Sequence, residues 1–193
     1  MIGFSPQTTQ QLGMAILIAT IAAMITLSLL YVGIPFFGPV NDLLTAVISI
    51  LIAGLVWQFH PVVWEKKPTL AAILLIAALL GVVLMAGNAT LVAFGKMGWQ
   101  LGGMYTAFGF ALTGVWLIGM LLTAKGQPFL TSGLVTLGLI AGICLLFGFL
   151  AGPLMAKQIT IGFQPLVWIS YIAAGAGWIM FPIWCWRLAV HLK

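Results

Sequence analysis

The chain is almost without charge. Only 5% of its 193 residues are Asp, Glu, Lys or Arg, whereas 63% are hydrophobic. A soluble domain carries about a quarter charged residues, because its surface faces water. So few charges cannot cover a water-facing surface for this much apolar chain. The composition therefore excludes a soluble domain and predicts that lipid surrounds most of the protein.

The chain also lacks a basic patch. Its net charge of +5 comes from seven Lys and Arg against two acidic residues. These basic residues are scattered and form no stripe, so we expect no nucleic-acid partner. They suit the anionic headgroups of a bilayer, which is the partner that the composition predicts.

Motifs for catalysis and cofactor binding are missing as well. There is no HExxH, GxSxG, CxxCH, GxGxxG or phosphate-binding loop. Cys144 and Cys185 lie in apolar runs, without the spacing of a metal site or a disulfide framework. With only two acids, no helix can carry paired carboxylates for general acid–base catalysis. We therefore expect no metal and no cofactor, and an enzyme would be poorly equipped.

A basic leader is absent too. Residues 1–10 contain no Lys or Arg, whereas a secretory signal begins with a basic region and ends at a small-residue cleavage site. We expect the apolar segment that follows to be a retained first helix.

The few charges divide the chain into long neutral stretches. A helix needs roughly 20 apolar residues to cross the hydrocarbon core, and each stretch is long enough for one crossing. The sequence predicts an all-α fold: one polytopic membrane bundle over residues 1–193, with about six transmembrane helices and short loops that make neighbours antiparallel. The predicted spans are 12–32, 43–60, 69–94, 99–123, 129–151 and 162–188.

The loops differ in basic residues from one side to the other. One side holds Lys66, Lys67, Lys125, Arg187 and Lys193, and the other holds Lys96 and Lys157. Because cytoplasmic loops carry the excess of Lys and Arg, this asymmetry predicts that both termini are cytoplasmic. We expect the protein to be integral to a plasma (inner) membrane of the bacterial type.

Asp42 is the acidic residue closest to a predicted span. It follows Asn41 at the point where the second helix is predicted to begin. Asn and Asp at such a position commonly cap the helix, and negative charge suits that end of the helix dipole. The alternative is a proton or cation site at the outer mouth of the bundle, because ionisable groups in membranes are often functional.

Uncharged polar groups gather at the same predicted depth. Asn88, Tyr105 and Gln164 fall, with Asp42, in the outer half of their helices. Asn88 would be costly in lipid, so it should face the bundle and find a partner. One interpretation is a hydrogen-bond network that only holds helices together. The other is a pocket that opens outward and binds a ligand or ion through these four residues.

Two histidines lie at the opposite end. His60 and His191 end the second and sixth predicted helices, so a haem or metal held between them is conceivable. Neither has a second ligand one helical turn away, and histidines at the membrane interface commonly have no such role. They are candidates for cofactor binding, but we expect no cofactor.

Glycines spaced four residues apart recur in the later helices. The pairs Gly98/Gly102, Gly138/Gly142 and Gly148/Gly152 have the spacing that lets helices approach closely. Such contacts can lie within the fold or between protomers.

Three classes of function remain. The first is a non-catalytic membrane protein: an accessory subunit that assembles with other membrane subunits or with itself, or a protein that binds a lipophilic ligand among its helices. The second is a small transporter or channel with an outward-facing polar pocket, which requires a continuous polar path. The third is an intramembrane enzyme that modifies a lipid.

Overall fold

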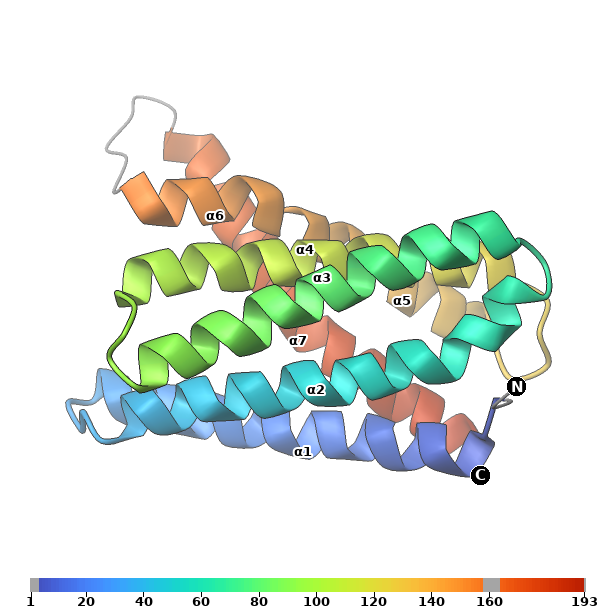
Figure 1. Ribbon diagram of the computed structural model, residues 1–193, viewed down its shortest axis with the longest axis horizontal. Helices are drawn as coiled ribbons and strands as arrows, with labels where there is room; N and C mark the ends of the chain where they lie inside the picture. The colour runs from blue at the N-terminus through green and yellow to red at the C-terminus, as the bar shows by residue number, and fades with distance from the viewer. Residues whose placement is uncertain (1–3, 158–163, 193) are drawn as a thin grey trace.

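The protein is an α-helical bundle (Figure 1). The computed structural model describes residues 4–157 and 164–192. Within these ranges the regular elements are α1 (Pro6–Tyr31), α2 (Phe37–Trp64), α3 (Pro68–Ala93), α4 (Trp99–Ala124), α5 (Ser132–Leu146), α6 (Gly148–Lys157) and α7 (Gln164–His191). Six helical spans among the described residues are long and apolar enough to cross a membrane, α5 and the start of α6 forming one of them. The predicted multi-pass helix bundle is thus confirmed.

Two helices, α1 and α2, begin about six residues before the predicted spans, and in α1 polar residues form the added turns. α1 begins at Pro6, where the Ser5 side chain accepts a hydrogen bond from the Thr8 backbone N–H at 3.3 Å. Ser is a favoured N-cap, and proline suits the first helical position. The prediction from hydropathy placed this helix too late, because it assigned the polar turn to the preceding segment.

The start of α2 corrects a second prediction. The helix begins at Phe37, and Phe36 occupies its N-cap without a side-chain hydrogen bond. Asp42 therefore lies inside the helix, beyond its first turn, and is not the cap. The reason is local: the chain turns at Gly33, which has a φ of 94°, and resumes helical geometry soon afterwards.

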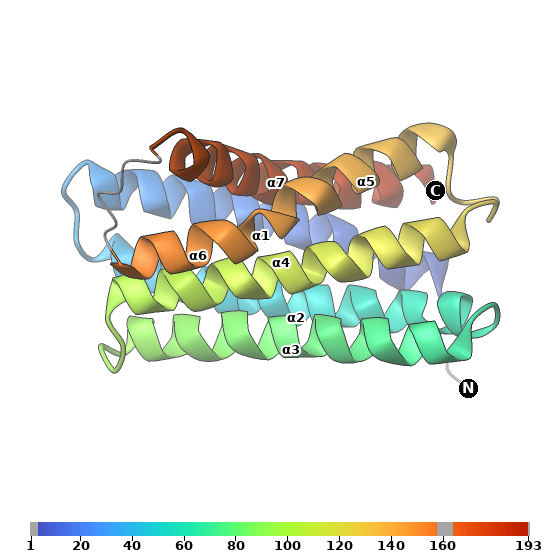
Figure 2. The same ribbon diagram turned by 90° about the horizontal axis from the view of Figure 1, so that it is seen from above.

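The fifth predicted span is broken in two. At the break, Phe147 donates its backbone N–H to the Cys144 carbonyl at 3.2 Å, a three-residue spacing tighter than that of an α-helix. Beyond it, Gly148 and Gly152 bring α6 against the backbone of α4. Figure 2 shows α5 slanting away while α6 follows α4.

The helices close into a ring. α1 to α4 pack consecutively, α4 packs against α5 and α6, α5 packs against α7, and α7 returns to α1. The start of α1 and the end of α7 lie at the same end of the bundle, on the right in Figure 1. Large apolar side chains cover the outside: Ile18, Ile76 and Ile172 are each more than 60% exposed. Such a surface is suited to hydrocarbon, and it embeds the protein in a bilayer.

The interior near the termini is filled by aromatic side chains. Phe59, Trp116, Phe181 and Trp184 are at most 2% exposed. The Trp184 indole donates to the Leu134 carbonyl at 3.1 Å, so its polar N–H is satisfied inside the apolar layer. The interior at this end of the bundle is therefore densely packed with aromatic side chains.

Glycines set the distance between α3, α4 and α5. A Cβ on Gly81 would lie 2.7 Å from the Gly109 carbonyl oxygen, and a Cβ on Gly114 would lie 2.7 Å from that of Gly142. Real Cβ atoms do not approach a carbonyl so closely, so only glycine permits these crossings. Of the glycine pairs identified from the sequence, Gly138/Gly142 and Gly148/Gly152 pack within the fold.

We expect Gly81→Ala to destabilise the protein, because the added methyl group forces α3 away from α4. Overpacking of this kind costs about 1–3 kcal/mol. Gly87→Ala is the matched control on the same helix, since a Cβ there meets nothing within 4 Å. Thermal unfolding in detergent should show a lower midpoint for Gly81→Ala alone. Equal midpoints for both variants would contradict the glycine crossing.

Candidate ligand-binding cavity

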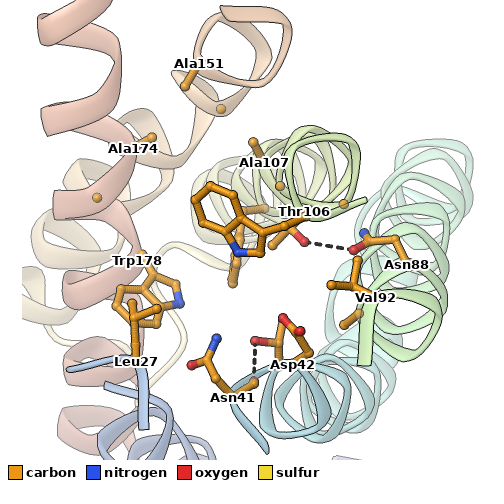
Figure 3. Close-up of a pocket in the computed structure, with 18 of the residues that line it drawn as sticks. Leu27, Asn41, Asp42, Asn88, Val92, Thr106, Ala107, Ala151, Ala174 and Trp178 are labelled. Carbon is orange, nitrogen blue, oxygen red and sulfur yellow. Dashed lines mark hydrogen bonds between the residues drawn. The ribbon is translucent and has the colours of Figure 1, made fainter. Parts of the chain in front are cut away.

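A cavity of about 340 Å³ lies at the end of the bundle opposite the termini. Residues from all seven described helices line it, including the end of α1, the start of α2, the end of α3 and the first half of α7 (Figure 3). Ligand pockets commonly span about 300–1,000 Å³, so this cavity lies at the lower end of that range.

Small residues leave this space open. Much of the lining from α4, α6 and α7 is glycine or alanine. These small residues are Gly102, Gly103 and Ala107 on α4, Gly148 and Ala151 on α6, and Ala174 and Gly175 on α7. With so little side-chain volume, the helices cannot fill the middle of the bundle at this depth. At the opposite end, large buried aromatic side chains occupy the corresponding layer between the helices.

Large apolar and aromatic side chains form the rest of the wall. The aromatic ones are Tyr31, Trp99, Phe110, Tyr171 and Trp178, and the aliphatic ones include Leu27, Val92 and Leu145. Such a lining offers contact area for an apolar molecule, and its tyrosine and tryptophan rings also carry polar edges.

The polar side of the cavity comes from the start of α2. Asp42 is partly buried and lines the space together with Asn41 and Thr45. Among the described residues, no side chain forms a hydrogen bond or ion pair with the Asp42 carboxylate. The Asn41 side-chain oxygen is buried and has no hydrogen-bond partner in the described part of the chain. Thr45 does not supply one, because its hydroxyl donates to the Asn41 backbone carbonyl at 3.1 Å.

Asn88 forms part of the opposite wall. It is 6% exposed, and its Oδ1 accepts a hydrogen bond from the Thr106 hydroxyl at 3.1 Å. Its Nδ2 donates to the Leu84 carbonyl on its own helix. Figure 3 shows Asn88 and Trp178 on opposite sides of the space next to Asn41 and Asp42. The amide of Asn88 therefore joins α3 to α4, and its bonding capacity is largely used within the protein.

The structure brings together two of the four residues suggested by the sequence. Asp42 and Asn88 line the cavity, whereas Tyr105 is partly buried on α4 outside its lining. The side chain of Gln164 lies outside the described part of the structure. Sequence reasoning identified neither the unpaired oxygen of Asn41 nor the aromatic walls, because single tryptophans and tyrosines near helix ends resemble ordinary interface anchors.

The two histidines belong to the other end of the bundle. His60 lies between Trp57 and Trp64, with ring centroids 6.3 Å and 5.5 Å away. His191 lies beside Arg187 along a surface groove. In residues 4–157 and 164–192, no group of three or more His, Cys, Asp or Glu side chains is placed to hold a metal ion. Aromatic packing accounts for the position of His60.

Comparison with known protein families, with curated proteins and with solved structures finds no match to this chain. Fold alone does not imply function, so the function rests on the chemistry of the site itself.

The Asn88–Thr106 hydrogen bond should stabilise the wall of the cavity. We expect Thr106→Val to lower the free energy of unfolding by about 0.6 kcal/mol, the average found for such bonds between membrane helices. Thr90→Val is the control, because the Thr90 hydroxyl bonds only the Ala86 carbonyl of its own helix. Detergent-induced unfolding in mixed micelles measures both variants. A control as destabilised as Thr106→Val would show that the link between helices contributes nothing.

Proposed function

We propose that this protein binds a lipophilic small molecule within the membrane, in the cavity at the end opposite its termini. One observation carries this proposal. The space is walled by apolar and aromatic side chains, and two polar groups of α2, Asn41 and Asp42, border it without a partner among the described residues. Apolar walls with a few convergent polar groups are the usual composition of ligand sites.

The energetics of the unpaired oxygen support an occupant. A buried acceptor that loses its partner costs about 1–3 kcal/mol, and the cost rises where the surroundings are apolar. The Asn41 oxygen avoids this cost when its amide rotates toward the cavity and accepts a hydrogen bond from water or from a ligand there. An amphipathic ligand would match both parts of the site. Its polar end would lie against α2, and its apolar body would lie against the aromatic walls.

The other predicted functions receive less support from the geometry. A transporter or channel needs a polar path across the membrane, and such a path would have to pass the buried layer that contains Phe59, Trp116 and Trp184. A subunit of a larger complex needs a contact surface, but the exposed apolar side chains would serve lipid contact equally well. An enzyme needs reactive groups in addition to Asp42, which is the only acidic residue of the cavity.

The orientation forms part of the proposal. Five of the seven Lys and Arg residues fall on the side of the termini, which supports a cytoplasmic location for both ends. In a plasma membrane the cavity would then lie at the outer side, where a ligand can enter from the medium or from the outer leaflet.

Filling the cavity should abolish ligand binding. We expect Ala174→Phe to remove any lipophilic molecule that copurifies with the wild-type protein, because the ring would occupy the space beside Trp178. Ile172→Phe is the control, since Ile172 is 68% exposed and faces lipid on the same helix. Mass spectrometry of extracts from polymer-bounded native nanodiscs provides the measurement. If the retained molecules are the same in all three proteins, the cavity is not the binding site.

The orientation is tested by labelling single cysteines with a membrane-impermeant maleimide. In a background with Cys144→Ala and Cys185→Ala, we expect Lys96→Cys to react in intact cells. Lys66→Cys should react only after the membrane is permeabilised, because its loop lies at the end that holds the termini. The reverse pattern would place the cavity on the cytoplasmic side.

A further inference from the structure

The described lining of the cavity holds one charged side chain. Asp42 lines the space, whereas no Lys, Arg or His is among the described lining residues. An anionic ligand would therefore meet a carboxylate with no compensating cation in that lining, and like charges at short range repel strongly. A neutral ligand would leave the carboxylate without an ionic partner, and a partly buried charge is costly unless it is paired.

We infer that the ligand carries a protonated amine, whose N–H groups bind Asp42 and Asn41. This inference rests on the proposed function of the cavity as a ligand site. Both α2 groups left without a partner can act as hydrogen-bond acceptors: the Asp42 carboxylate borders the cavity directly, and the buried Asn41 side-chain oxygen reaches it when the Asn41 amide rotates. A protonated amine supplies a positive charge and several donors at one point, which matches the pair.

The side chain of Asn88 is not available to bind the amine. Its oxygen already accepts from Thr106, and its amide nitrogen already donates to the backbone of α3. The acceptor pair on α2 is therefore the polar anchor of the cavity, and the wall around Asn88 is neutral.

The aromatic walls also favour a positively charged ligand. Trp99, Tyr171 and Trp178 line the space that Asp42 borders. The face of an aromatic ring attracts a cation, tryptophan most strongly, and the attraction grows when the cation is removed from water. These rings would also contact the apolar body of the ligand, so the same walls suit both parts of a lipophilic amine.

The depth of Asp42 fits an amphipathic ligand. α2 has 28 residues, which corresponds to about 42 Å of helix against a hydrocarbon core of about 30 Å. Asp42 lies early in this helix and therefore near the boundary between headgroups and hydrocarbon. An amine bound there keeps its charge at the membrane surface while its hydrocarbon chain extends into the bundle, as long amphipathic side chains do at this depth.

The test compares ligands that share one chain and differ in the head. Radiolabelled decylamine is bound to the protein in phosphatidylcholine nanodiscs at neutral pH, with empty nanodiscs as the blank. Decanol, decyl sulfate and decyltrimethylammonium serve as competitors. We expect unlabelled decylamine to compete at least tenfold more strongly than decanol, and decyl sulfate to compete least. Decyltrimethylammonium should fall in between, because it keeps the charge but has no N–H donors.

Two acid variants locate the interaction. Asp42→Asn keeps the size of the side chain and removes its charge, so it should weaken decylamine binding at least tenfold and leave competition by decanol unchanged. Glu65→Gln removes the other acid of the chain, at the opposite end of the bundle, and should have no effect. Asn41→Leu should weaken decylamine more than decyltrimethylammonium, since only the amine can donate to the Asn41 oxygen.

The outcomes separate the two proposals. If all decyl compounds compete equally in wild type and Asp42→Asn, and all are lost in Ala174→Phe, the cavity binds ligands but the amine inference is wrong. If decylamine does not bind above the blank, or binds equally to Ala174→Phe, the proposed function fails as well. Phosphatidylethanolamine added to the nanodiscs identifies the source of the amine. Loss of decylamine binding would indicate a lipid headgroup, and unchanged binding would indicate a free amphiphile.

Discussion

The fold depends on one constraint: a backbone surrounded by hydrocarbon must pair its own N–H and C=O groups. Helices achieve this within a single segment, and so the described chain crosses the bilayer as helices joined by short loops. Lipid is as apolar as the side chains, so burial alone does not hold the helices together. Close packing does so instead, and it requires the glycine crossings between α3, α4 and α5.

The distribution of side-chain volume then divides the bundle into two different ends. Near the termini, Phe59, Trp116 and Trp184 fill the space between the helices. At the other end, small residues on α4, α6 and α7 lie at the same level and leave the cavity. The break at Phe147 contributes, because it lets α6 follow α4 through Gly148 and Gly152.

Polar groups in the bundle fall into two kinds according to their partners. Threonines such as Thr20 and Thr113 donate their hydroxyl to the carbonyl one turn earlier in their own helix, so the hydroxyl needs no partner on another helix. Asn88 and Thr106 satisfy one another across a helix interface. Asn41 and Asp42 differ from both kinds, since the described chain gives them no partner in the space they border. This difference is what makes the start of α2 a candidate binding site rather than part of a packing network.

The sequence by itself determined the membrane environment and the six candidate spans, because composition and the spacing of charges control partition into lipid. It also placed Asp42 and Asn88 at one end of the bundle. It could not determine that Asp42 lies within α2 rather than capping it, since a helix start depends on the turn at Gly33 and Phe36. Only the tertiary structure decided that a cavity exists. The space depends on which small and aromatic side chains, from helices far apart in the sequence, lie at the same level of the bundle. The sequence of a single helix does not show which side chains these are.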